Sequence, residues 1–316
     1  MGATAKDLHV DKVLTEFAMG YRPAGMIADM IFPMVTVDKQ TDIYLQADRG
    51  RILRRQKTAR SPGNEARRVE RDFGSATYHC KNYALKDMVT IEDKANMDPG
   101  MIFSKVEDKA QGLLDDILLD YEIRVLDMIN TAANVGSSAA VSSGWGGSGD
   151  PLGDVNTALD NVRYANGVKA NKVLFGPEAW DTFRRDSTVR NLILGTNNGG
   201  GYVNEAQVAK LLDVETVMVS EAFENSADDG QAESLNPIMV DNVLVYYVTP
   251  TASIDRPTFG ATFRWQQANL PAPLVVERHP YNSRTHSEEV EVGLYQDEKI
   301  TGASYGFLLT AVNSST

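Results

Sequence analysis

The chain has 316 residues, of which 42% are hydrophobic and 23% charged, with a formal net charge of −12. This composition is that of a globular protein with ample material for a buried core, in one large domain or two ordinary ones. No run of about 18 apolar residues occurs, and charged Lys6 and Asp7 stand where a secretion signal would be apolar. The single cysteine, Cys80, excludes an internal disulfide framework and a cysteine-based zinc site. We therefore expect a soluble protein that is neither exported nor embedded in a membrane.

The charge is unevenly distributed. Residues 49–71 contain nine basic side chains and two acidic ones, Glu65 and Glu70, so this segment has a net charge of +7. Because the whole chain has a net charge of −12, the remaining residues sum to −19. The nine are Arg49, Arg51, Arg54, Arg55, Lys57, Arg60, Arg67, Arg68 and Arg71. The acidic total argues against wholesale nucleic-acid binding, whereas a short basic element on an acidic body can attract another copy of the same chain.

The first 85 residues predict an arm followed by a long hairpin. Residues 1–30 show no sustained period and are interpreted as an arm, or as a short helix followed by coil. A β-branched and aromatic run over 32–45 predicts a strand, and residues 76–85 predict a second extended segment. The basic stretch lies between them and contains the turn residues 61–64, so we expect it to form the hairpin tip.

A long amphipathic helix is predicted over residues 99–133. Asp98 is a good N-cap, and Pro99 suits the first helical position. Apolar residues then recur every three or four positions, at Phe103, Val106, Ala110, Leu113, Ile117, Tyr121, Val125, Met128 and Ala132. At 1.5 Å per residue this helix would be on the order of 50 Å long, and Asp115 and Asp116 fall on its polar side.

The remaining chain predicts alternating short helices and strands. A Gly/Ser stretch at 136–149 is interpreted as a linker, and 196–201 and 225–233 as flexible loops. Helices are predicted at 151–164, 177–183 and 205–212, and strands at 171–176, 215–220, within 237–248, and at 262–265, 274–278, 290–295 and 305–309. We expect antiparallel closure in the last third and an α+β fold rather than a wound parallel sheet.

The signals for enzyme chemistry are weak. Residues 144–149 satisfy G-x-G-x-x-G, but the serine-rich segment before them is no core strand, and Asp150 would place a carboxylate beside the phosphate. The histidines, His9, His79, His279 and His286, show no metal-ligand spacing, and no nucleophile elbow or P-loop occurs. The acidic pairs Glu107-Asp108, Asp115-Asp116 and Asp228-Asp229 are interpreted as solvated faces. We expect no catalytic residues, no metal and no cofactor.

The basic stretch has two functional interpretations. It could bind a nucleic-acid backbone, or it could lie across the acidic surface of a neighbouring subunit. A hairpin with few apolar residues at its tip cannot bury a core of its own, and this one lacks the interleaved aromatics of a single-strand binder. The second interpretation is therefore favoured.

Several phrases, taken in order, resemble the major capsid proteins of tailed bacteriophages. They are Asp98-Pro99 before the long helix, Lys172–Trp180 with its following helix, Val208–Val214 leading into Val217–Val219, and Pro257–Phe263. The resemblance covers nearly the whole chain and implies the α+β Hong Kong 97 capsid fold. It implies an N-terminal arm (1–35), an extended hairpin loop (36–85), a peripheral domain (86–150) with a spine helix at 99–133, an axial domain (151–260), and strands returning to the peripheral domain (261–316).

The same resemblance implies a shell function. The chain would assemble with itself into hexamers and pentamers of an icosahedral head that encloses DNA, in a virion built in the host bacterial cytoplasm. The nine basic residues would contact an adjacent subunit, and Lys57 is available for the covalent crosslink that some relatives form. Because only about 35 residues precede the loop, a separate scaffolding protein is expected, with a portal and a decoration protein as further partners. An encapsulin-type compartment is the alternative within the fold, and a nucleotide-binding enzyme using residues 144–149 is the alternative from another class.

Overall fold

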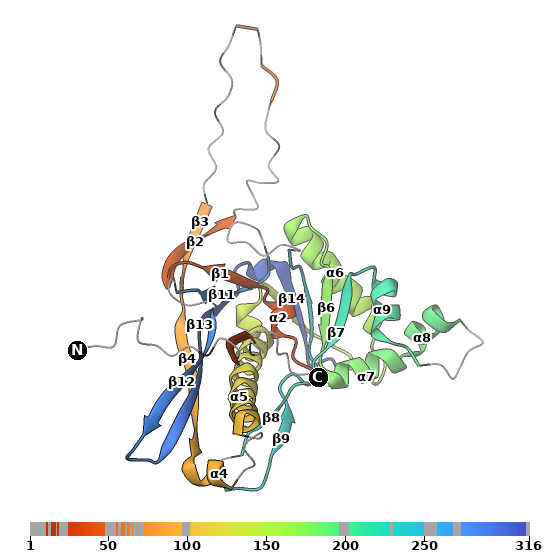
Figure 1. Cartoon of the computed structure of the whole chain (residues 1–316). Helices are drawn as coiled ribbons and strands as arrows, with labels where there is room; N and C mark the ends of the chain where they lie inside the picture. Colours follow the sequence, from red (N-terminus) through yellow and green to blue (C-terminus); the bar gives the residue numbers. More distant parts are fainter. Residues whose placement is uncertain are drawn as a thin grey trace.

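The fold is taken from a computed structural model (Figure 1). It describes residues 11, 14–16, 18, 25–47, 55, 58–60, 62–63, 65, 68, 73–96, 102–195, 202–227, 230–249, 258–267 and 273–313. Over these residues, helices accompany two five-stranded sheets and two two-stranded ribbons. The predicted α+β class is confirmed.

The first sheet has the strand order β1-β11-β13-β12, with β4 also paired to β13. Its strands are β1 (Met34–Val37), β4 (Lys81–Thr90), β11 (Ala261–Trp265), β12 (Leu274–Asn282) and β13 (Ser287–Lys299). Only the β1–β11 pair is parallel. The antiparallel closure expected for the last third of the chain is thus confirmed within this sheet.

The second sheet has the order β5-β14-β10-β6-β7. Its strands are β5 (Ser137–Ala140), β6 (Lys172–Phe175), β7 (Thr216–Val219), β10 (Val243–Tyr246) and β14 (Gly306–Thr310). One apolar core joins it to α6 (Pro151–Asn166), α7 (Pro177–Arg185), α8 (Ser187–Leu194) and α9 (Glu205–Leu212). A second core joins it to α2 (Ala28–Ile31) and the end of the long helix. All four β10 residues are buried, as expected of a strand covered on both faces.

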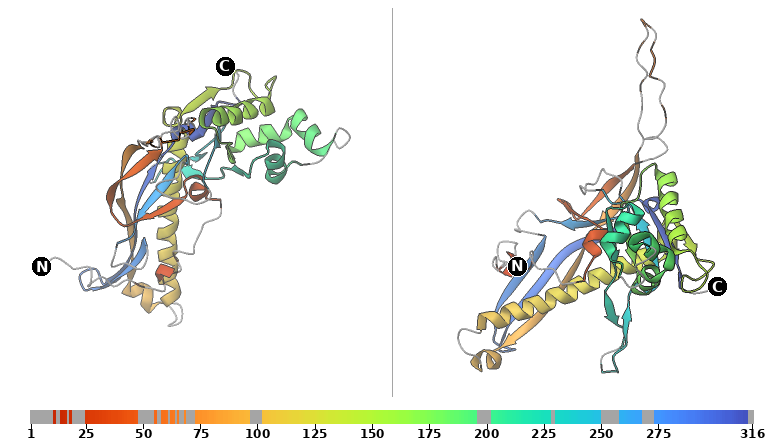
Figure 2. Two further views of the ribbon diagram at one scale, coloured as in Figure 1. Left: turned by 90° about the horizontal axis from the view of Figure 1, so that it is seen from above. Right: turned by 90° about the vertical axis from the view of Figure 1, so that its right-hand side faces the viewer.

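The long helix α5 (Ile102–Asn130) lies against both sheets (Figure 2). Its first half buries apolar residues against β4, β12 and β13, and its last turns belong to the core under the second sheet. The predicted start at Asp98-Pro99 lies outside the described residues. The predicted end at 133 is wrong, because Thr131 and Asn134 side chains donate to the carbonyls of Asp127 and Met128 and so cap the helix.

One further prediction needs correction. The Gly/Ser stretch is no free linker, because β5 pairs with β14 and Trp145 is buried in the core. The segment 237–248, in which one or two buried strands are predicted, contains the buried strand β10. The helices predicted at 151–164, 177–183 and 205–212 are confirmed. Within the described part of the chain, no helix is both long and apolar enough to cross a membrane.

Candidate assembly surfaces

A hairpin of β2 (Thr41–Ala47) and β3 (Phe73–His79) carries the basic stretch. The two strands pair antiparallel from Thr41 opposite His79 to Ala47 opposite Phe73, as the predicted hairpin requires. The single strand predicted over 32–45 is instead divided between β1 and β2, and the segment predicted over 76–85 is divided between β3 and β4. The hairpin leaves the body beside β1 and β11 (Figure 1). In the sequence, the basic stretch follows Ala47 of β2 and precedes Phe73 of β3. The two paired strands therefore hold both ends of the basic stretch.

Aromatic packing fixes the hairpin base to the first sheet. Tyr44 and Tyr78 are 4% and 3% exposed and lie against Phe263 of β11, with ring centroids 5.3 and 4.8 Å from it. The Tyr78 hydroxyl donates to the carbonyl of Lys39 at 3.2 Å. Ile43, on the opposite face of β2, is 58% exposed. One face of the hairpin base is therefore anchored, and the other is open to solvent.

The junction of β3 and β4 is held at Cys80. The backbone N–H of His79 donates to the Asp297 carboxylate at 2.8 Å, and the Cys80 N–H donates to the Gln40 carbonyl at 2.9 Å. The Cys80 side chain is fully buried, and burial raises the pKa of its thiol to about 11. A protonated, covered thiol is inert, so Cys80 has a packing role here.

Three of the nine basic residues lie within the described part of the chain. Arg55, Arg60 and Arg68 are all exposed. The other six, Arg49, Arg51, Arg54, Lys57, Arg67 and Arg71, lie outside the described residues. The expected contact of these residues with an adjacent subunit stays a prediction.

The beginning of the chain is tied to the long helix by a carboxylate that the sequence did not single out. Glu122 of α5 is 1% exposed and accepts from the N–H of Ile27 at 3.1 Å and from the N–H of Ala28 at 2.8 Å. Burial raises the pKa of Glu122, and these two backbone hydrogen bonds oppose the rise. The first N–H groups of helix α2, which have no partner within the helix, thereby donate to the buried Glu122 carboxylate.

The arm also contacts the first sheet. Leu14 is fully buried, the N–H of Asp11 donates to the carbonyl of Val276, and the N–H of Val276 donates to the Thr15 hydroxyl. These described arm residues therefore pack on their own subunit.

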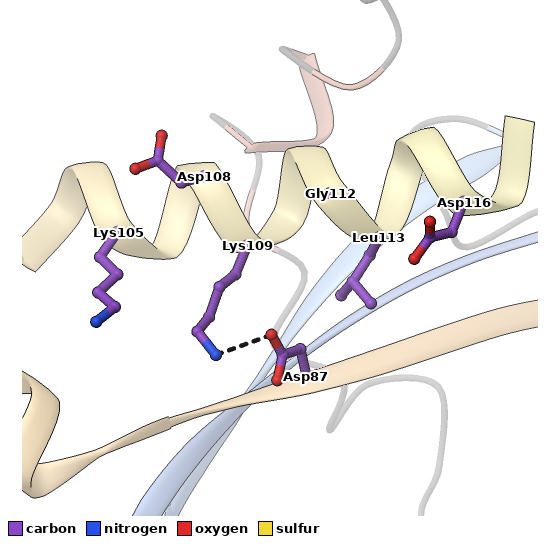
Figure 3. A pocket seen from close by; sticks show the side chains of 7 residues that line it. All are labelled: Asp87, Lys105, Asp108, Lys109, Gly112, Leu113 and Asp116. Carbon is purple, nitrogen blue, oxygen red and sulfur yellow. Dashed lines mark hydrogen bonds and ion pairs between the residues drawn. The ribbon is translucent and has the colours of Figure 1, made fainter. Parts of the chain in front are cut away.

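A polar depression of about 590 Å³ lies between α5 and β4 (Figure 3). The Lys109 ammonium donates to the Asp87 carboxylate at 2.8 Å and to the Met88 carbonyl at 2.6 Å. The hydrogen bond from Lys109 lowers the pKa of Asp87. Asp108 and Asp116 also line the depression. The Lys109 ammonium is already hydrogen-bonded to two residues of β4. The depression therefore has a structural role in joining helix α5 to the sheet.

The glycine-rich string at 144–149 serves the local fold. The Trp145 N–H donates to the Val312 carbonyl at 2.8 Å, and its indole N–H donates to the Asp154 carboxylate at 2.9 Å. Asp150 caps α6 by accepting from the Gly153 N–H at 3.0 Å. The preceding strand, β5, is an exposed edge strand. The carboxylate of Asp150 thus occupies the place where a phosphate would meet the helix.

The described histidines have ordinary partners. His79 contacts the Thr41 hydroxyl at 2.6 Å, His279 the Glu291 carboxylate at 3.0 Å, and His286 the Tyr281 hydroxyl at 2.8 Å. Across the residues that the structure describes, no group of three or more His, Cys, Asp or Glu side chains could hold a metal ion.

No family model matches the sequence. Two curated relatives do, both named major capsid protein. That of Pseudomonas phage JBD67 is 26% identical over 307 residues, which cover 94% of this chain and 95% of the relative. That of Burkholderia phage BcepMu is 23% identical, over 99% of this chain and 100% of the relative.

Solved structures share the fold. A phage-related protein from Bordetella bronchiseptica matches with a TM-score of 0.74 and 20% identity, over 97% of this chain and 98% of that one. The capsid structure of cyanophage P-SCSP1u matches with a TM-score of 0.58 and 13% identity, over 99% and 96%. An encapsulin from Synechococcus elongatus matches with a TM-score of 0.51 and 14% identity, over 97% of each chain. The fold expected from the sequence resemblance, a capsid fold, is confirmed.

Proposed function

We infer that this chain, which is a homologue of phage major capsid proteins and has their fold, is itself a major capsid protein. The observation that carries this is a sequence similarity that spans 94% of this chain and 95% of the relative from phage JBD67. The similarity therefore concerns a whole shell subunit and not one shared domain. The subunit assembles with itself into an icosahedral head enclosing DNA, as hexamers and pentamers.

The setting follows from this function. The shell is part of the virion and is built in the host bacterial cytoplasm, around a separate scaffolding protein, with a portal at one vertex and a decoration protein outside. The chain has no catalytic role and needs no cofactor.

Electron microscopy of the purified protein tests the proposal. Rings or closed shells are expected, either alone or with the scaffolding protein. A chain that remains monomeric under all salt and scaffold conditions would overturn it. Nucleic acid inside the particles, together with portal and terminase genes beside this one, separates a phage head from an encapsulin-type compartment, whose gene would neighbour a cargo enzyme. The encapsulin likeness in fold, at 14% identity, makes this comparison necessary.

The basic stretch is the proposed inter-subunit contact. Arg49, Arg51, Arg54, Arg55, Lys57, Arg60, Arg67, Arg68 and Arg71 lie on an acidic face of a neighbouring copy. Support comes from the anchored hairpin base, from the exposure of Arg55, Arg60 and Arg68, and from the net charge of −19 on the residues outside 49–71.

Replacement of Arg54 and Arg55 by Glu tests this contact. Shell yield should fall while the subunit stays folded, because charges at an interface act chiefly between partners. The same charge change at Arg163 and Lys210, exposed on α6 and α9, is the control for net charge. Unchanged yield and shell stability in the hairpin variant would refute the contact.

A further inference from the structure

A second ribbon, formed by β8 (Phe223–Asn225) and β9 (Leu235–Pro237), pairs with no strand beyond its own two in the described chain. Phe223 lies opposite Pro237, and Asn225 lies opposite Leu235. Two-stranded ribbons are marginally stable in water unless something covers a face.

The two faces of the ribbon differ in chemistry. Because side chains alternate along a strand and opposite residues share a face, Phe223, Asn225, Leu235 and Pro237 lie on one face, and Glu224 and Asn236 lie on the other. Phe223 is 52% and Leu235 64% exposed, whereas the residues of β10 are all buried. An exposed aromatic and an exposed leucine on one small ribbon are the composition of a contact surface.

Polar side chains on both faces and in the turn give the ribbon its shape. The Asn236 amide donates to the hydroxyls of Ser226 and Ser234, at 3.1 and 3.2 Å. The Asn225 side chain accepts from the N–H groups of Ala227 and Ser234, at 3.2 and 2.9 Å. The ribbon is thus held by its own polar hydrogen bonds, which leaves its apolar face presented for a partner.

The stretch of sequence that contains the ribbon carries charge of one sign. From Leu211 to Asp255 the sequence has no lysine or arginine. It has nine acidic residues over the same stretch: Asp213, Glu215, Glu221, Glu224, Asp228, Asp229, Glu233, Asp241 and Asp255. Within the described residues, the salt bridges are made by other carboxylates and not by Glu221, Glu224 or Glu233. A partner for this surface must supply both cations and apolar contact.

The basic stretch of the same chain has this chemistry, with Ile52 and Leu53 between Arg51 and Arg54 in the sequence. The hairpin β2–β3 leaves the body at one end, and the ribbon β8–β9 lies at the opposite end (Figures 1 and 2). Two elements that depart from opposite ends of one subunit meet most directly when they belong to two copies. Such a contact is head-to-tail, so it repeats around a ring.

We propose that the ribbon β8–β9 is the receiving surface for the basic stretch 49–71 of a second copy of this chain. Arginines pair with Glu221 and Glu233, which precede Phe223 and Leu235 by two residues each, while Phe223 and Leu235 lose their exposure to water. This rests on the proposed shell function and names the acidic residues that complete the contact. Opposite potentials on the two elements speed the encounter and fix which surfaces meet.

Charge reversal on each element, alone and together, tests the pairing. One variant carries Glu221→Lys and Glu233→Lys, and the other carries Arg54→Glu and Arg55→Glu. Each alone should lower the yield of shells about tenfold or more, since like charges would then face each other. The combined variant restores the wild-type net charge and should return the yield to within about threefold of wild type.

The outcomes separate the two proposals. If the wild-type chain forms no ring or shell, the shell function itself fails. If the wild type forms shells and the ribbon variant assembles equally well, the ribbon is not the receiving surface, although the shell function stands. If both single variants fail and the combined variant is not rescued, the two elements do not face each other, and the ribbon's partner is another basic protein.

Carbodiimide crosslinking of wild-type shells gives an independent measurement. Lys57 is the single lysine between residues 49 and 71. Shells assembled from equal amounts of ¹⁵N-labelled and unlabelled chains should yield mixed-label peptides that join Lys57 to Glu221 or Glu233. Links from Lys57 that consistently reach acids of other elements would overturn the proposal.

Discussion

The carboxylate of Glu122 offers the sharpest test of how the arm is held on the long helix. Replacement by alanine leaves the N–H groups of Ile27 and Ala28 without their acceptor in a site where Glu122 is 1% exposed. Each buried, unsatisfied donor costs about 1–3 kcal/mol. Loss of the buried charge offsets part of this cost. We therefore expect the free energy of unfolding to fall by about 2–4 kcal/mol.

Glu122→Gln separates the charge from the shape. The glutamine retains one oxygen acceptor but turns an NH₂ group toward two donors, so a loss of about 1–2 kcal/mol is expected. Because burial raises the pKa of Glu122 in the folded state, the folded state binds a proton more tightly than the unfolded state does. The stability of the wild type relative to the Gln variant should rise as the pH falls from the raised pKa toward the ordinary value of about 4.3.

Hydrogen exchange by mass spectrometry reads the local effect, and urea denaturation reads the global one. Peptides that span residues 27–32 should lose protection in the Ala variant, and to a smaller extent in the Gln variant. Glu107→Ala, a partly exposed position on the same helix, is the matched control. If peptide protection is unchanged and the free energy of unfolding moves by less than about 0.5 kcal/mol, Glu122 does not hold the arm.

Three further predictions concern the hairpin base and the start of α6. Tyr78→Ala should cost about 3–5 kcal/mol in urea denaturation, through lost stacking on Phe263. Tyr78→Phe should cost about 1 kcal/mol, through the hydrogen bond to Lys39 alone, and equal losses would contradict this division. Cys80, buried and with a pKa of about 11, should react with a thiol reagent at pH 8 only as fast as the fold opens, and immediate labelling of native protein would argue against this burial. Asp150→Ala should cost about 1 kcal/mol and Asp150→Asn much less, and a larger loss for Asn would show that the charge and not the cap matters.

Periodicity was enough to predict the elements that bury one regular face. The 3.6-residue repeat along α5 corresponds to its buried residues Val106, Leu113, Ile117 and Val125. The proline at the first position of α6 and of α7 marked both helix starts. These signals are local, so a single chain carries them without reference to tertiary contacts.

Features made by distant contacts were not predicted. Glu122 looks like any helix-surface acid, and its role depends on residues about a hundred positions away. Trp145 sits in a Gly/Ser stretch that composition identifies as a linker, yet it is buried against Phe183. The order of strands in each sheet is also beyond local pattern, since β1 and β11 pair across more than two hundred residues. The presence of a lone tryptophan in a Gly/Ser stretch was the one hint that the sequence offered.

The position of α5 as one wall of two hydrophobic cores has a consequence for how the subunit unfolds. Its early turns complete the core under the first sheet, and its late turns complete the core under the second. Strands of both sheets come from both halves of the chain, since β1 pairs with β11 and β5 with β14. Neither half of the chain, expressed alone, would retain a closed core. The subunit should therefore unfold in a single cooperative transition. A destabilising substitution in one core should also lower the stability of the other.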